Sequence, residues 1–150
     1  MIISKLKAAA NLLRYADTPP AFVYGLGGSQ NYQMDSPSWS VNVFDVTDRF
    51  NYDKFTERQF TIKIGIYVIS EFNREPDYYD NILDALYPIQ EQLLLNLENQ
   101  KTSDNRRLIL IEGEIVTQQQ HQIPNFDAPV TGLEFTFRCK LTDYRGKCIA

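Results

Sequence analysis

The sequence is poor in the residues that build cross-linked or metal-bound folds. Among 150 residues it has two cysteines and one histidine. Cys139 and Cys148 lack the C-x-x-C spacing of zinc and redox sites, and two cysteines are too few for a disulfide scaffold. His121 lies among glutamines, with no cysteine or aspartate at metal-ligand spacing. We therefore expect reduced thiols, no metal and no cofactor.

Long apolar runs and an excess of positive charge are also missing. No stretch of about 18 apolar residues occurs, so we expect a soluble protein that does not enter a membrane. The first residues do not follow the pattern of an export signal. Fifteen basic against nineteen acidic residues give a net charge of −4, which disfavours nonspecific adhesion to nucleic acid through a broad basic face.

Motifs of known catalytic sites are not found. The glycine-rich stretch from Gly25 to Gly28 lacks the Lys-Ser/Thr pair of a phosphate-binding loop. Neither G-x-S-x-G nor H-E-x-x-H occurs. Asp45, Asp48 and Asp53 could be oxygen ligands for a hard cation, but the central glycine and bidentate glutamate of a calcium loop do not follow them. We expect a protein that is not an enzyme.

Two helices are expected from the spacing of apolar residues. The first runs from Ile2 to Tyr15 and cannot pass the pair Pro19-Pro20. The second begins at Pro76-Asp77 and continues to about Glu98. Pro88 lies inside the second helix, and it predicts a kink or two abutting segments because proline lacks an amide hydrogen and clashes with the preceding turn.

Strands are expected where apolar and polar residues alternate. The expected ranges are Phe22 to Tyr24, Ser38 to Val46, Arg58 to Phe72, Leu108 to Val116 and Thr131 to Thr142. The long third strand is expected to project beyond its sheet, and the fourth, apolar on both faces, to lie near the centre and pair with the last. Thr47 to Glu57 is expected to be a polar connection, and Thr117 to Val130 a long polar hairpin tip.

This order of elements predicts one α+β domain over residues 1–150. We expect a mostly antiparallel sheet of four to five strands, with an N-terminal helix and one long central helix packed on one face. No internal repeat suggests a second domain.

Charges and aromatic residues are unevenly distributed. The segment from Glu75 to Gln100 has six acidic residues and no lysine or arginine, whereas both chain ends are basic. Nine of the nineteen aromatic residues lie between Ala21 and Phe60, much of which is expected to be loop. Loop aromatics can anchor protein interfaces or stack nucleic-acid bases. Protein contact is favoured here because acids outnumber bases locally, and the alternative that several of them roof the core stays open.

These patterns select fourteen candidates for contacts with other subunits or partner proteins. They are Tyr24, Tyr32, Trp39, Phe50, Tyr52, Phe55, Asp80, Asp84, Gln119, His121, Phe126, Arg138, Lys140 and Arg145.

From about Ser38 onward, the chain resembles the tail-terminator and neck-ring proteins of tailed bacteriophages. The resemblance lies in the strand Phe60 to Val68, which leads into the helix at Ile82 to Ile89, and in a ribbon with a loose tip that closes on Gly132 to Phe137. The aromatic stretch Ala21 to Pro37 has no counterpart in it, and the family has no catalytic motif to carry over.

The resemblance implies a structural protein of the virion, in the phage neck or tail and assembled in the host cytoplasm. It implies a homo-oligomeric ring, six-fold or a multiple, around a channel through which DNA passes without sequence-specific binding. Other neck or tail proteins would be its partners. The acidic helix of one subunit could meet the basic chain ends of the next, or the acidic surface could line the channel.

Two hypotheses from other classes stay open on the sequence alone. One is a small-ligand or single-stranded nucleic-acid binding module that uses the loop aromatics near Trp39. The other is a metal-assisted hydrolase that uses Asp45, Asp48 and Asp53.

Overall fold

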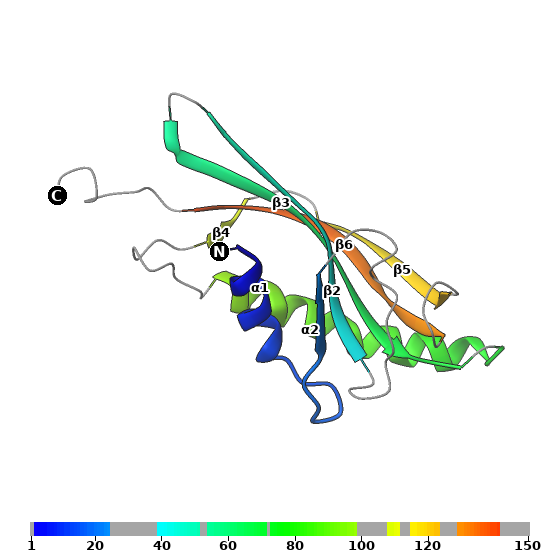
Figure 1. The fold of residues 1–150 in the computed structure, drawn as a ribbon. Helices are drawn as coiled ribbons and strands as arrows, with labels where there is room; N and C mark the ends of the chain where they lie inside the picture. Colours follow the sequence, from blue (N-terminus) through cyan, green and yellow to red (C-terminus); the bar gives the residue numbers. More distant parts are fainter. Residues whose placement is uncertain are drawn as a thin grey trace.

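The computed structural model of the protein describes residues 2–24, 39–51, 54–71, 73–98, 108–111, 115–123 and 129–141. Within these ranges, residues 50–51, 54–57, 120–123 and 141 are described by their backbone alone. The described residues form two helices and six strands, which build one layer of helices against one sheet (Figure 1).

The six strands form one sheet that is mostly antiparallel. Its order is β1-β2-β3-β6-β4, and β5 also pairs with β6. The strands are β1 (Ala21–Tyr24), β2 (Trp39–Asn51), β3 (Lys54–Ile69), β4 (Leu108–Leu110), β5 (Val116–Ile123) and β6 (Val130–Leu141). Only the pairing of β1 with β2 is parallel. The α+β fold is confirmed, with six strands instead of four to five.

Both helices, α1 (Ile2–Asn11) and α2 (Pro76–Glu98), cover the same face of the sheet (Figure 1). The core lies between the two helices and the sheet. β3 contributes its alternating apolar side chains from Phe60 to Val68, and β6 contributes those from Leu133 to Cys139. Leu6 of α1 and Leu86 of α2 are fully buried against these rows. The alternation in the two strands therefore decides which sheet face receives the helices.

The first helix ends at Asn11, four residues before the expected end at Tyr15. The Arg14 guanidinium donates hydrogen bonds to the carbonyl oxygens of Asn11 and Leu13, both at 2.7 Å, and so satisfies backbone acceptors at the helix end. Ala16 and Asp17 then adopt φ values of 50° and 63°, which turn the chain out of the helical direction.

The second helix matches its expected bounds, but the alternative of two abutting segments is wrong. The structure has one continuous helix from Pro76 to Glu98 with Pro88 inside it. Pro88 lies on the exposed side, so the carbonyl of Asp84, which loses its amide partner, faces water and can be hydrated.

The connection expected from Thr47 to Glu57 is wrong, because β2 continues to Asn51 and β3 begins at Lys54. A β-bulge in β2 hides this continuity in the sequence. Val43 lies opposite Ile64, yet Asp45 lies opposite the very next residue, Lys63. The extra residue shifts the alternation by one position, so that the apolar side chains no longer recur at odd-numbered positions.

The long ribbon of β2 and β3 extends beyond the rest of the sheet, as expected for the third strand. β3 pairs with β6 only from Gln59 onward, while its earlier residues pair with β2 alone. Figure 1 shows this ribbon reaching past the end of the other strands.

The strand expected from Leu108 to Val116 is two strands, and the hairpin tip expected from Thr117 to Val130 is largely strand. β4 and β5 share one edge of β6. Leu110 and Val116 are six residues apart, whereas their partners Cys139 and Thr136 are three apart, so the intervening residues cannot all join the ladder. β5 contains four glutamines and was misread because backbone pairing at a sheet edge does not need apolar side chains.

Candidate interaction surfaces

A group of cations gathers on the outer face of the sheet, the face turned away from the helices. This basic patch consists of Arg49 in β2, Lys63 in β3, and Arg138 and Lys140 in β6, all exposed. Gln59 joins two of them, since it pairs with Arg49 on one side and with Lys140 on the other.

The register of the strands fixes the size of the basic patch. Lys63 lies four residues along β3 from Gln59, a rise of about 13 Å, and three strands span about 10 Å. The exposed side chains of Thr47 and Thr136 lie on the same face and are neutral. The patch is therefore a flat surface of about 13 by 10 Å.

Among the described residues, two carboxylates lie on the same face at the basic patch, those of Asp45 and of Glu134, which is two residues from Thr136, the partner of Lys63. Asp45 is exposed and lies opposite Lys63. Asp48 is on the other side of the sheet, since it lies opposite the core residue Phe60, and its carboxylate pairs with Arg58 at 3.3 Å. The described part of the patch thus has four cations against two anions.

Next to the patch, the buried ring of Tyr67 covers part of the outer face of the sheet. The Tyr67 ring is 1% exposed, packs edge-on against Phe44, and donates its hydroxyl hydrogen to the Glu134 carboxylate at 2.5 Å. Burial, followed by the hydrogen bond and the charge of Glu134, raises the pKa of the phenol far above its usual range. Tyr67 is therefore a neutral donor that fixes Glu134, and it cannot act as a proton acceptor for a ligand.

The second charged surface is a row of carboxylates along α2. This acidic stripe consists of Asp77, Asp80, Asp84 and Glu91, which are exposed and recur at helical spacing on one side of the helix. It spans about 21 Å at 1.5 Å per residue. The opposite side of α2 is buried against the sheet, so the stripe points away from it.

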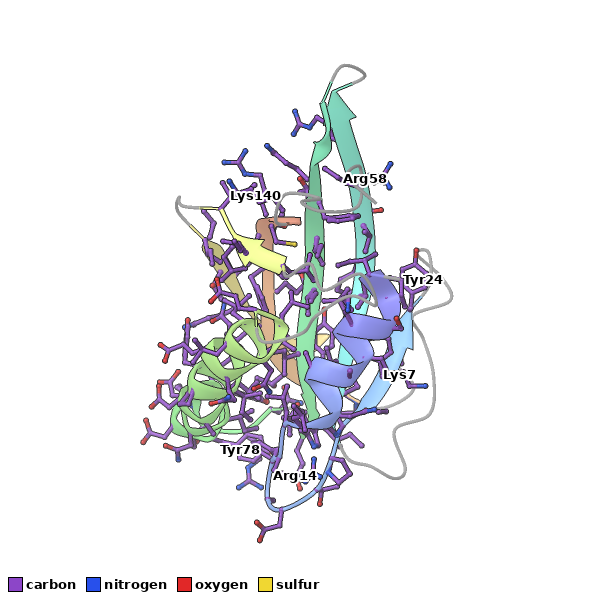
Figure 2. All side chains as sticks on the ribbon, turned by 90° about the vertical axis from the view of Figure 1, so that its left-hand side faces the viewer. Lys7, Arg14, Tyr24, Arg58, Tyr78 and Lys140 are labelled. Carbon is purple, nitrogen blue, oxygen red and sulfur yellow. The ribbon has the colours of Figure 1, made fainter. Side chains whose placement is uncertain are left out.

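The two charged surfaces lie far apart on the subunit. Figure 2 shows side-chain oxygens along the outer side of α2, near the labelled Tyr78, and Lys140 of the basic patch higher in the view, away from them. The cation nearest in sequence before the stripe, Arg74, pairs with Glu71 at 2.8 Å and lies over the Tyr78 ring at 4.7 Å. The stripe therefore has no described ion pair within its own helix.

The structure brings together two pairs of the candidates taken from the sequence, one pair on each charged surface. Asp80 and Asp84 lie in the acidic stripe, and Arg138 and Lys140 lie in the basic patch. Sequence reasoning missed Lys63 and Arg49. Lys63 could have been found, because the alternation of β3 already placed it on the polar face.

Trp39 is wrong as a contact residue. Its side chain is fully buried, its ring packs against Tyr15 at a centroid distance of 5.9 Å, and its indole N–H donates to the carbonyl of Thr18 at 2.9 Å. A residue inside the core cannot contact a partner, so the alternative that an aromatic roofs the core is correct at this position.

The other candidates divide by what the structure describes. Tyr24 is 53% exposed, and Gln119 is exposed and donates to the Tyr87 hydroxyl at 2.8 Å. Phe50, Phe55 and His121 lie in β2, β3 and β5, where the backbone alone is described. Tyr32, Tyr52, Phe126 and Arg145 lie outside the described residues.

The described ranges contain no group of three or more histidine, cysteine, aspartate or glutamate side chains placed to hold a metal ion. Asp45 and Asp48 lie on opposite faces of the sheet, so they do not converge, and Asp53 falls outside the described residues. Cys139 is buried in the core, where burial raises the pKa of its thiol to about 12. Such a thiol is a poor nucleophile and a poor metal ligand at neutral pH.

A scan against protein-family models gives no match for this sequence, and a search of curated proteins finds no significant match. Within the described ranges, neither helix is long and apolar enough to cross a bilayer. The function is therefore inferred from the charged surfaces and from the shape of the fold.

Proposed function

We propose that the protein is a structural subunit of a homo-oligomeric ring in a bacteriophage neck or tail end, as a tail terminator or head–tail joining ring around the DNA channel. The observation that supports this most is the separation of opposite charges onto two surfaces of one subunit, the basic patch on the sheet and the acidic stripe on α2. The order of β3, α2 and the β5–β6 ribbon agrees with the resemblance to that family.

Two complementary surfaces on different faces of one subunit allow copies to assemble into a ring. A contact between the stripe of one subunit and the patch of the next is heterologous, because each subunit uses two different surfaces. A heterologous contact repeats with the same rotation until it closes into a ring or continues as a filament. A ring that caps a tube requires closure of this kind.

Further features of the fold suit a ring that passes DNA and joins other proteins. The net charge of −4 per subunit disfavours strong adhesion to the DNA that moves through a channel. The projecting β2–β3 ribbon extends beyond the layer of helices and can reach a neighbouring neck or tail protein (Figure 1).

The proposal is tested by the assembly state of the purified protein. Native mass spectrometry and negative-stain electron microscopy, at low and moderate ionic strength, should show closed rings of one stoichiometry, alone or on isolated tail tubes. A protein that is monomeric at every concentration and on every tail or neck preparation would refute the proposal.

The alternative is a binding module for small ligands or single-stranded nucleic acid that uses the aromatic residues near Trp39. Trp39 itself cannot contact such a ligand, because it is buried in the core. Tyr24 remains an exposed aromatic residue of that segment. Fluorescence anisotropy with labelled single-stranded DNA separates the two functions. Tight binding that Tyr24→Ala removes, without any ring, would favour the alternative.

A further inference from the structure

We propose that the basic patch is the docking surface for the acidic stripe of a second copy of this chain. This inference rests on the proposed function and deepens it, because it assigns the contact that repeats around the ring. It differs from the contact with the basic chain ends considered from the sequence, since two of the four cations come from β2 and β3 in the middle of the chain.

The charges on both surfaces are available for such a contact. Among the described residues, the recorded ion pairs are Arg58 with Asp48 and Arg74 with Glu71, and none of these residues belongs to the patch or the stripe. The stripe thus holds exposed charges of one sign, and the patch keeps an excess of positive charge over Asp45 and Glu134.

Repulsion within each surface would be relieved by a partner of opposite charge. Asp80 and Asp84 are four residues apart on one helix face, an arrangement in which like charges destabilise a helix. Asp77 is favoured by the positive end of the helix dipole, but Asp80, Asp84 and Glu91 lie beyond the first turn, where this effect has faded. The helix dipole therefore does not stabilise these three carboxylates.

The dimensions of the two surfaces agree. Asp77 to Asp84 spans about 10 Å along the helix axis, and a helix is about 10 Å wide. The basic patch measures about 13 by 10 Å and is flat, because its residues stand on one face of three adjacent strands. One helix lying across the patch therefore brings three carboxylates within reach of four cations.

The stripe cannot reach the patch of its own subunit. The stripe points away from the helix-covered face of the sheet, while the patch lies on the other face. Contact between them must join two copies, and it leaves one stripe and one patch free for the next copies. DNA is the other polyanion that could occupy the patch, and the experiment below distinguishes it.

The experiment is a charge swap with a matched control. Lys140→Glu reverses a patch charge, Asp84→Lys reverses a stripe charge, and Lys7→Glu makes the same change as the first on the exposed side of α1. Assembly is followed by sedimentation velocity at low ionic strength, and folding of each variant by thermal unfolding.

We expect Lys140→Glu and Asp84→Lys each to raise the protein concentration needed for assembly about tenfold or more, because like charges then face each other at every contact. Lys7→Glu should change it less than about twofold. Assembly should return in the doubly substituted chain, and also in an equimolar mixture of the two single variants, where each reversed surface meets an opposite charge.

Different failures have different meanings. Wild-type rings that Lys140→Glu and Asp84→Lys weaken no more than Lys7→Glu does would overturn this contact and leave the ring proposal standing. If Lys140→Glu abolishes retention of duplex DNA but leaves assembly unchanged, the patch is a DNA surface and the contact is also overturned. A wild-type protein that never assembles overturns both proposals.

Discussion

Tyr67 can lie flat over the centre of the sheet because the two residues beneath it are glycines. Gly65 precedes it on the same face of β3, and Gly132 is directly opposite on β6. A methyl group at Gly65 would lie 2.5 Å from the Tyr67 hydroxyl oxygen and 2.6 Å from its ring carbons. At Gly132 it would overlap the backbone carbonyl oxygen of Ile66 and lie 2.6 Å from the Tyr67 ring.

The two glycines therefore predict different costs when each is replaced by alanine. For Gly132→Ala the obstacle is the backbone of β3, so the two central strands must separate, and we expect a loss of about 3 kcal/mol or more in the free energy of unfolding. For Gly65→Ala the obstacle is a buried ring, and we expect about 2 kcal/mol. Domains of this size are stable by roughly 5 to 15 kcal/mol, so both losses are readily measured.

A double-mutant cycle separates the two obstacles. In a Tyr67→Leu background the cost of Gly65→Ala should fall by about 1 kcal/mol or more, while most of the cost of Gly132→Ala should persist. Urea unfolding followed by the fluorescence of Trp39, the one tryptophan of the chain, provides the free energies. The reasoning is refuted if Gly132→Ala lies within about 0.5 kcal/mol of the wild type, or if Tyr67→Leu leaves the cost of Gly65→Ala unchanged.

Three further predictions concern the buried polar and aromatic groups. Because the pKa of Tyr67 is raised in the folded protein, the unfolded chain loses the phenolic proton first as pH rises. The free energy of unfolding should therefore fall above about pH 10, by up to about 1.4 kcal/mol per pH unit from this residue. Urea titrations of Tyr67→Phe should show a shallower fall, and an identical pH profile would contradict the assignment. In a Cys148→Ser variant, the reaction of Cys139 with a thiol reagent should be slower in the native protein than in urea by a factor of about 100 or more. The reason is that the thiol is buried and its pKa is about 12. Equal rates in the two conditions would show that the core is open. Trp39→Phe should cost about 2 kcal/mol through lost packing and the lost hydrogen bond to Thr18, and iodide should hardly quench the wild-type emission unless the indole is exposed.

The sequence predicts the parts of the fold in which one periodicity runs without interruption. The apolar residues of β3, β6 and α2 recur at constant spacing over many positions, and these elements lie close to their expected ranges. β2 defeats the same reasoning because its bulge at Phe44 and Asp45 shifts the period midway. β5 defeats it because a glutamine-rich edge strand has no apolar alternation to detect.

The charged surfaces show the same division. Asp80 and Asp84 are neighbours on one predicted helix, so their grouping follows from local spacing alone. The basic patch requires the register between β3 and β6, which places Lys63 next to Arg138 across more than 70 residues of chain. A single sequence does not contain that register. Arg49 was not predicted to lie on the sheet, because the range 47–57 was expected to be a connection and not part of a strand.

Under the proposed contact between stripe and patch, added salt should have opposite effects on the subunit and on its assembly. Screening weakens the repulsion within the stripe and within the patch, so we expect the melting temperature of the isolated subunit to rise slightly with ionic strength. The same screening weakens the proposed attraction between stripe and patch, so rings held together by it should dissociate. The proposed contact therefore predicts that concentrated salt keeps the subunit free and that dialysis into dilute buffer starts assembly.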